Sequence, residues 1–472
     1  MKSVFTAAVA AASLVSGAFA GRVKKRQAGN LPPVTVSGNA FMAGEDRFFI
    51  RGVAYQPGGA ADAADPLLDT EALAADIEMF RELGINTIRI YTVDNAGDHE
   101  EAMRMLDEAG IYLALDASTP EYSLNRADLE SLHWSYNTDY LQHLFATIDE
   151  FAGYSNLLLF FSGNEVINAR NNTNAAPYIK AVTRDMKRYI GAQADRRIPV
   201  GYSAADVKEN IYQQAVYFSC GEDDNARSDF FAFNDYAWCD PSSFTISGWD
   251  QKVELYSNYS LPIFLSEFGC ITNRRDWNEI EALMSENMTA VYSGGLAYEF
   301  TIEPNGYGLV ELGSNGAAEP NADFDRLADA FAANPAPTGM AGAKSEEEAV
   351  HLECPAESED WPLDTNNLPE IPSSAEQLIT DGAGEAPGLD GPGSQTSGAE
   401  QSATEPDLSN GVTTSEDTTN ESGGSSNNNA NSDSGSSGSG SGSGDSESAA
   451  GSVNAAFGTV VVAAVAAMAL VN

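Results

Sequence analysis

The sequence predicts one α/β domain of the (β/α)8 TIM-barrel class, followed by a disordered Ser/Gly-rich stalk. Short apolar runs alternate with amphipathic helical patterns over roughly 300 residues, which is the order of elements in a closed parallel barrel. The runs are apolar on both faces, as parallel strands covered by helices must be. Two of these runs end in a glutamate, Glu165 and Glu267, where a barrel strand meets solvent.

The expected strands and helices follow one another in order. The strands are residues 48–55, 85–93, 111–118, 157–165, 198–203, 229–236, 262–269 and 294–301. The helical patterns between them include residues 68–83, 99–109, 138–151, 178–190 and 277–291. A doubly wound open sheet is the competing arrangement, and it would place a glycine-rich phosphate turn after the first strand. The sequence there, from Arg51 to Gly59, does not fit such a turn.

The amino terminus predicts secretion. Residues 1–20 combine an early Lys, an apolar stretch and the small-x-small site Ala18-Phe19-Ala20, which is the pattern of a signal peptide. The run Lys24-Lys25-Arg26 suggests a second cleavage, with a plain basic turn as the equal alternative. We therefore expect the catalytic barrel domain to span residues 27–335.

The carboxyl-terminal third predicts a tether. Residues 336–372 form an extension, and residues 373–451 are Ser, Gly and acidic residues that cannot bury enough apolar surface to fold. Residues 452–472 are an apolar tail without a following basic cluster, preceded by small residues. This pattern predicts a GPI-attachment signal, with a transmembrane anchor as the alternative.

Composition excludes some partners. The chain has 25 Lys and Arg against 69 Asp and Glu, a formal net charge of −44. A phosphate backbone demands a basic face, so nucleic acid is not an expected partner.

Four cysteines in a secreted chain are expected to form disulfides, with three connectivities open. Without a CxxC and with only four His, neither a metal site nor a cofactor is expected. The glycosylation sequons are Asn171, Asn258, Asn287 and Asn420.

The two glutamates predict retaining glycoside chemistry. That reaction needs two carboxyl groups about 5–5.5 Å apart, one to protonate the leaving oxygen and one to attack the anomeric carbon. Glu165 closes the fourth expected strand and Glu267 the seventh, and a barrel brings both to one mouth. Asn164 suits a hydrogen bond to the sugar 2-hydroxyl. The alternative is that both are ordinary strand-end carboxylates.

Several motifs in this order resemble the fungal GPI-anchored β-1,3-glucanosyltransferases of glycoside hydrolase family 72, over residues 30–335. The motifs are GVAYQPGG at 52–59, GINTIRIY at 84–91, GNEV at 163–166, SEFG at 266–269 and EPNGYGLV at 303–310. The resemblance implies Glu165 as acid/base and Glu267 as nucleophile. It also implies Tyr91 and Asp116 at the donor site.

The resemblance implies further roles. Tyr236 matches a tyrosine that hydrogen-bonds the nucleophile, and Tyr298 and Tyr307 match aromatics that line sugar subsites. It pairs Cys239 with Cys270 and Cys220 with Cys354, the second bond tying the extension back to the barrel.

The chain also departs from its relatives. Leu73 and Ala102 stand where relatives usually have a cystine, and Ala54 and Ala75 where they often have Asp and Arg. With only Cys354 beyond the barrel, no Cys-rich carbohydrate-binding module is expected.

The expected function is a retaining β-1,3-glucanosyltransferase that cleaves one glucan internally and transfers the new end to another, remodelling the fungal cell wall. The alternatives are a β-1,3-glucan hydrolase and a non-catalytic glucan-binding wall protein. The expected partners are donor and acceptor β-1,3-glucan and, through a GPI lipid, the outer leaflet of the plasma membrane. We expect a monomer on the cell surface or in the wall.

Overall fold

The computed structural model describes residue 23 and residues 29–59, 63–313, 318–350, 352–363 and 367–395. The signal peptide, the run Lys24-Lys25-Arg26, the chain beyond residue 395 with Asn420, and the apolar tail lie outside the described residues. In the part that is described, we find no helix long and apolar enough to cross a bilayer.

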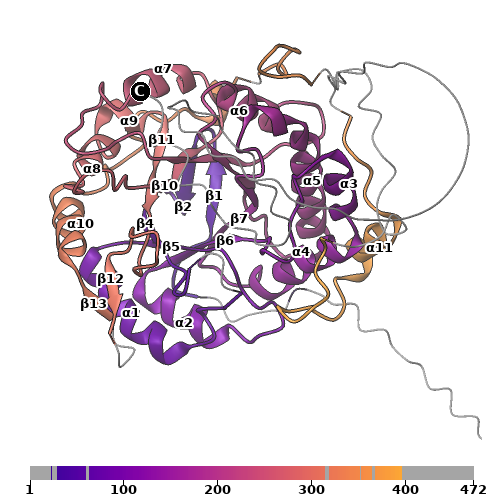
Figure 1. The fold of residues 1–472 in the computed structure, drawn as a ribbon, viewed down its shortest axis with the longest axis horizontal. Helices are drawn as coiled ribbons and strands as arrows, with labels where there is room; N and C mark the ends of the chain where they lie inside the picture. The colour runs from indigo at the N-terminus through magenta and orange to yellow at the C-terminus, as the bar shows by residue number, and fades with distance from the viewer. Residues whose placement is uncertain are drawn as a thin grey trace, which may run out of the picture. The chain divides into compact units, whose positions relative to one another are not determined.

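Eight strands close into a barrel that is ringed by helices (Figure 1). They are β4 (Ile50–Ala54), β5 (Thr87–Ile90), β6 (Tyr112–Asp116), β7 (Leu157–Asn164), β8 (Val200–Ala205), β9 (Phe230–Asp235), β10 (Ile263–Phe268) and β11 (Tyr292–Ala297). All neighbouring pairs are parallel, and β11 returns to β4 with Gly294 opposite Ile50. The predicted fold class and the eight strand positions are confirmed.

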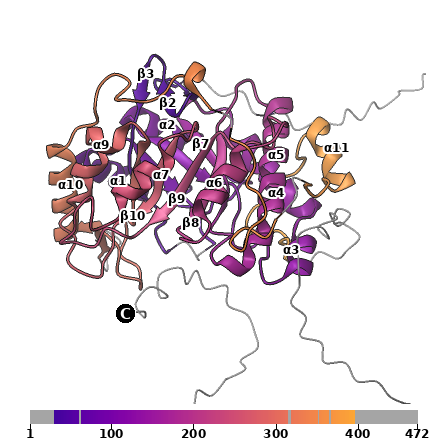
Figure 2. The ribbon, with the colours of Figure 1, turned by 90° about the horizontal axis from the view of Figure 1, so that it is seen from above.

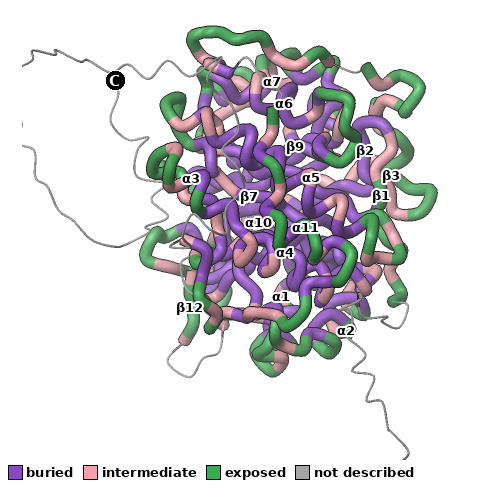
Figure 3. The backbone as a smooth tube through the Cα atoms, turned by 90° about the vertical axis from the view of Figure 1, so that its right-hand side faces the viewer, coloured by how far each residue is buried: buried purple, intermediate pink, exposed green. Residues whose placement is uncertain are grey.

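The helices pack their apolar residues against these strands, and Figure 3 shows buried residues concentrated in the interior of the molecule. The helices are α1 (Thr70–Leu83), α2 (Glu100–Ala109), α3 (Leu129–Ser135), α4 (Thr138–Phe151), α5 (Ala176–Gln193), α6 (Ile211–Ser219), α7 (Trp249–Tyr256), α8 (Glu279–Leu283), α9 (Glu286–Thr289) and α10 (Ala322–Ala333). A 3-10 helix, η1 (Arg170–Ala175), follows β7, and β12 (Val310–Leu312) pairs antiparallel with β13 (Ala318–Pro320). The expected single helix over residues 277–291 is wrong, because the extended backbone of Ser285 separates α8 from α9.

Helix α1 shows how local sequence sets these elements. The Asp69 side chain accepts a hydrogen bond from the Ala72 backbone N–H at 3.0 Å, which caps the first turn, and Gly84 ends the helix at φ 69°. Leu73 on α1 and Ala102 on α2 are both fully buried in one apolar core. The two side chains therefore pack together in the core without a covalent link.

An amino-terminal sheet that the sequence did not predict closes one end of the barrel. It consists of β1 (Val34–Ser37), β2 (Ala40–Ala43) and β3 (Asp46–Phe48), paired antiparallel (Figure 2). Phe41 packs its ring against Phe230 and Phe264, with centroids 6.0 and 5.8 Å apart. Both partners lie near the amino ends of their strands, so the sheet covers the end opposite the expected mouth.

The chain after the barrel folds back onto the outer helices. The disulfides Cys220–Cys354 and Cys239–Cys270 confirm both expected pairings. Next to the first bond, Trp361 is fully buried and packs on Tyr217 with ring centroids 5.2 Å apart.

The expected start of the stalk at residue 373 is wrong. Residues 373–395 contain helix α11 (Ser373–Asp381), which lies against α4 and α5 (Figures 1 and 2). The apolar side chains of Ala375 and Ile379 give the helix a buried face, because they point into the folded unit.

Candidate active site

The carboxyl ends of the strands gather the expected site residues at one mouth of the barrel. The residues and their places are Tyr91 after β5, Asp116 ending β6, Asn164 ending β7, Glu165 directly after it, Tyr236 after β9, Glu267 in β10, Tyr298 after β11 and Tyr307 on the following loop. Parallel strands deliver side chains in this way because their carboxyl ends all meet at the same rim.

Glu267 is held by donors on both of its oxygens. Tyr91 Oη donates to Oε1 and Tyr236 Oη donates to Oε2, each at 2.8 Å, while Arg89 Nη1 lies 3.3 Å from Oε1. Burial raises the pKa of Glu267, and Arg89 and the two tyrosines oppose that rise. These donors hold the carboxylate in one orientation, as a nucleophile requires.

Arg89 is a fully buried cation that the expected site did not include. Its Nε and Nη2 bind both oxygens of Asp116 at 3.0 and 3.2 Å, and Nη1 also donates to the Ser266 carbonyl at 3.2 Å. Its guanidinium stacks on Tyr91 and Phe161, 4.3 and 4.4 Å from the ring centroids. Asp116 is 3% exposed and balances the charge of Arg89. Its expected contact with the donor sugar stays a prediction.

Glu165 lies half-buried at the same rim. Its Oε1 accepts a hydrogen bond from Asn234 Nδ2 at 2.8 Å. Burial and the negative charge of Glu267 raise the pKa of Glu165 to about 7. A carboxyl group with that pKa keeps its proton close to neutral pH, which suits a general acid. The expected carboxyl separation of about 5–5.5 Å stays a prediction.

A network of short polar side chains links the two glutamate strands. Asn234 stands opposite Glu267 in the β9–β10 pair, and its Oδ1 accepts from Ser266 Oγ at 2.8 Å. Ser203 Oγ donates to Asn164 Oδ1 at 2.7 Å and lies 2.8 Å from Ser266 Oγ. Asn164 is thereby oriented by neighbouring strands, and its predicted contact with a sugar hydroxyl remains to be tested.

Four tyrosines form an aromatic cluster beside Glu267. Tyr298 lies 6.5, 6.3 and 5.4 Å, between ring centroids, from Tyr91, Tyr236 and Tyr307, all at steep interplanar angles. Asn305 supports this cluster, because its Nδ2 donates to Glu299 at 2.7 Å and its Oδ1 accepts from the Tyr307 backbone N–H at 3.1 Å. Aromatic faces of this kind stack on the apolar faces of pyranose rings while their hydroxyls donate hydrogen bonds.

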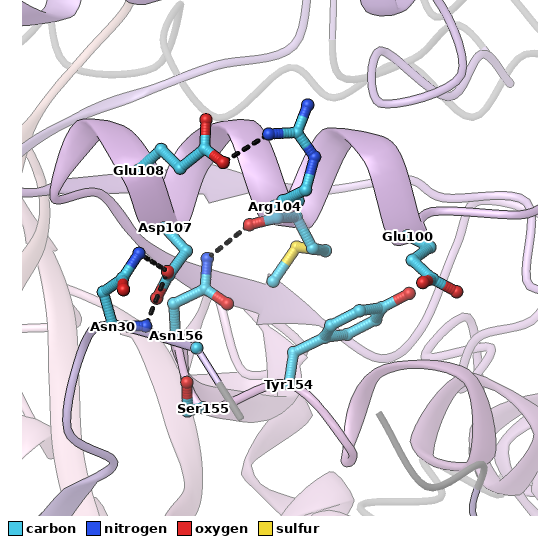
Figure 4. Close-up of a pocket in the computed structure, with 10 residues that line it drawn as sticks. Asn30, Glu100, Arg104, Asp107, Glu108, Tyr154, Ser155 and Asn156 are labelled. Atoms are coloured by element: carbon cyan, nitrogen blue, oxygen red, sulfur yellow. Dashed lines mark hydrogen bonds and ion pairs between the residues drawn. The ribbon is translucent and has the colours of Figure 1, made fainter. Parts of the chain in front are cut away.

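A separate pocket of about 300 Å³ lies beside α2 (Figure 4). It is lined by α2 and by the turn before β7, where Asn30 binds Asp107 and Asn156 donates to the Met103 carbonyl. The Glu165 and Glu267 side chains are not among its lining residues. The candidate active site is therefore the mouth at the carboxyl ends.

Two functional residues outside the predicted set carry a signal in the sequence. Arg89 interrupts the apolar run Ile88-Arg89-Ile90, and a buried arginine requires an acidic partner. Asn234 lies near the end of the expected strand 229–236, two residues before Tyr236, and the barrel order places this strand between the two glutamate strands. Arg126, which binds the Glu165 backbone carbonyl, lies on a loop and had no such signal.

A barrel with two carboxyl groups of different basicity at its carboxyl-terminal mouth is the arrangement of glycoside-cleaving enzymes. The chain matches the glucanosyltransferase family model, glycoside hydrolase family 72, over residues 23–334. It belongs to that family.

Relatives agree with this assignment. The chain is 53% identical to the 1,3-beta-glucanosyltransferase gel1 of Aspergillus fumigatus, over 77% of this chain and 79% of that protein. It is 48% identical to the 1,3-beta-glucanosyltransferase GAS5 of Saccharomyces cerevisiae, over 75% and 72%. Among solved structures, Saccharomyces cerevisiae Gas2p in complex with laminaritetraose and laminaripentaose aligns with a TM-score of 0.67 at 35% identity. That alignment covers 73% of this chain and 76% of that one.

Proposed function

We propose that this chain is a retaining 1,3-β-glucanosyltransferase. Glu267 attacks the anomeric carbon of a β-1,3-glucan while Glu165 protonates the departing oxygen, and a glucosyl ester forms on Glu267. Glu165, now a carboxylate, takes the proton from a hydroxyl of a second glucan. That hydroxyl displaces Glu267 and forms a new β-1,3 bond with retention.

One observation carries this proposal: the two carboxyl groups occupy contrasting environments at one rim. Glu267 has Arg89, Tyr91 and Tyr236 around it, which favour the carboxylate. Burial and the charge of Glu267 raise the pKa of Glu165 to about 7, which favours the protonated form. Glu267 is therefore suited to act as the nucleophile and Glu165 as the general acid.

Incubation with a reduced laminari-oligosaccharide acceptor tests the transfer step. Products longer than the donor support a transferase, and shorter products alone indicate a hydrolase, which is the second candidate. The choice between them depends on whether an acceptor sugar excludes water from the glucosyl ester. The names of the relatives and the laminari-oligosaccharides bound by Gas2p favour transfer on a β-1,3-glucan.

Substitution of the two glutamates tests the assigned roles. Glu267→Gln should abolish turnover, and Glu165→Gln should reduce it by about 10²–10⁴-fold on natural glucan. Glu311→Gln, at an exposed position on β12, is the matched control and should retain activity. Undiminished turnover of Glu267→Gln would remove the assignment of Glu267 as nucleophile. Binding of β-1,3-glucan without any turnover by the wild-type protein would instead favour the non-catalytic wall protein.

We also propose that the mature enzyme is a monomer held on the outer face of the plasma membrane by a GPI lipid, or passed into the wall. The apolar tail of residues 452–472 supports the lipid anchor. Release of the enzyme from cells by a phosphatidylinositol-specific phospholipase tests it. Asn171, Asn258 and Asn287 are exposed, as the proposed glycosylation requires.

A further inference from the structure

The chain that follows α11 runs back to the catalytic rim, and we call residues 382–395 the strap. It starts on α4 and α5, where the Ala383 backbone N–H donates to the Tyr189 hydroxyl at 2.8 Å and Gln142 Nε2 donates to the Ala383 carbonyl at 3.1 Å. Further on, the Gly388 N–H donates to Asn95 Oδ1 at 2.9 Å, on the loop after β5. Side chains of the barrel domain therefore fix the strap through its backbone.

The end of the strap is joined to the loop between β6 and α3, residues 117–128. Ser394 is fully buried, and its N–H donates to the Glu121 carbonyl at 2.9 Å. Gln395 Nε2 donates to the Ser123 carbonyl at 2.6 Å. A Cβ on Gly391 would lie 2.1 Å from the hydroxyl of Tyr122, whose ring stacks on His143 with centroids 4.1 Å apart. The loop is thus clamped between the strap and α4.

The same loop reaches the acid/base glutamate. The Arg126 guanidinium donates to the backbone carbonyl of Glu165. Glu165 itself has φ 48°, in the left-handed region that a non-glycine residue adopts only when its surroundings impose it. On the other side, the Glu165 N–H donates to the Ser203 carbonyl at 2.8 Å. Hydrogen bonds with Arg126 and Ser203 therefore hold the strained backbone of Glu165 on both sides.

We propose that the strap positions Glu165 by way of the 117–128 loop, and that Arg126 is a positioning residue for the proton transfers at that carboxyl. The proposal rests on the acid/base role of Glu165 given above. Glu267 has its own supports in Arg89, Tyr91 and Tyr236, which come from other strands. A displacement of about 1 Å costs on the order of a hundredfold in a positioned reaction. Loosening the strap should accordingly slow proton transfer and spare nucleophilic attack.

Two substrates separate these steps in the full-length chain. A laminari-oligosaccharide needs Glu165 to protonate the departing sugar, whereas 2,4-dinitrophenyl β-laminaribioside releases its leaving group unprotonated. We expect Arg126→Ala to lower turnover on the oligosaccharide by about tenfold or more. The rate of the first dinitrophenolate burst should stay within about twofold, since it depends on Glu267. Azide, an anionic acceptor that needs no base, should restore steady turnover of the aryl substrate.

Strap variants and controls complete the test. Gly391→Ala, which forces a side chain against Tyr122, should show the same selective loss. Asp390→Ala, at the exposed neighbouring position, and Arg104→Ala, which removes an exposed arginine from α2, should behave as wild type. Arg126 is exposed, so Arg126→Ala should fold normally. This variant therefore tests the proposal even if Gly391→Ala does not fold.

The result that overturns the proposal is an equal loss on both substrates, or no loss, for Arg126→Ala. Glu165→Gln is the reference in the same assay. If Glu165→Gln lacks the selective pattern, the acid/base assignment fails. If Glu165→Gln shows the selective pattern and Arg126→Ala does not, the proposed role of the strap is wrong and the acid/base assignment of Glu165 stands.

Discussion

Replacing Tyr236 by Phe should move the acidic limb of the pH profile. The Tyr236 hydroxyl donates to Glu267 Oε2 at 2.8 Å, and such a bond to a charged group contributes about 1.5–3 kcal/mol. Because the bond favours the carboxylate, its loss raises the pKa of Glu267. At about 1.4 kcal/mol per pKa unit, the rise is about one to two units. The limb of kcat/KM at low pH, where Glu267 takes up a proton, should shift upward by that amount.

The assay is the pH dependence of kcat/KM on a laminari-oligosaccharide, from pH 3 to 8. Tyr91→Phe removes the bond to the other oxygen and should cause a similar shift. Tyr292→Phe is the control, because its buried hydroxyl on β11 has no hydrogen-bond partner among the described residues. An acidic limb that stays in place in folded Tyr236→Phe and Tyr91→Phe proteins would refute the idea that these hydroxyls set the charge of Glu267.

Three further predictions concern pH and stability. The wild-type kcat/KM should decline above about pH 7, because the pKa of Glu165 is raised to about 7 and the general acid loses its proton above that pH. A decline that begins far from pH 7 would contradict this. Cys354→Ser opens a bond that spans 134 residues and should lower the free energy of unfolding by about 3–5 kcal/mol, and an unchanged melting temperature would count against that role. For His99, burial acts to lower the pKa, but hydrogen bonds to Asp65 and Glu150 outweigh it and raise the pKa to about 9. The charged His99 therefore stabilises the fold fully below its ordinary pKa of about 6.5, and this contribution is lost as the pH rises to about 9. In denaturant titrations, His99→Gln should lower the free energy of unfolding by at most about 3 kcal/mol at pH 6 and by much less at pH 9.5. An equal cost at both pH values would contradict that account.

The barrel strands were predictable because they are buried on both faces, and the composition of such strands is unambiguous. The amino-terminal sheet was missed because β1 to β3 are only three or four residues each and expose part of their length. The strap was assigned to the stalk because its Gly, Pro and acidic residues bury little apolar surface. Its order comes from side chains of Tyr189, Gln142 and Asn95, which are far away in the sequence. Local composition cannot show such contacts.

The two glutamates were predictable from strand ends alone, whereas their surroundings were not. The resemblance supplied Tyr236, and the structure places its hydroxyl on Glu267 as expected. The resemblance also implies that Asp116 is a donor-site residue. The structure shows in addition that Asp116 forms an ion pair with Arg89, which a buried carboxylate requires. The side chain of Arg89 spans from β5 to both Asp116 and Glu267, a contact that depends on which strands face each other across the barrel interior.

The division of labour between two chemically identical side chains follows from what the barrel places around each of them. Around Glu267 the interior strands supply a buried guanidinium and two phenols, so ionisation is supported where an attacking carboxylate is needed. Around Glu165 one amide hydrogen bond and the charges of Arg126 and Arg89 favour ionisation, but burial and the charge of Glu267 outweigh them and raise its pKa. Ester formation on Glu267 removes that charge, so the pKa of Glu165 should fall once the glucosyl ester exists. The same carboxyl that donates a proton in the first step is then ionised to accept one in the second, which is the reversal that transfer to an acceptor hydroxyl requires.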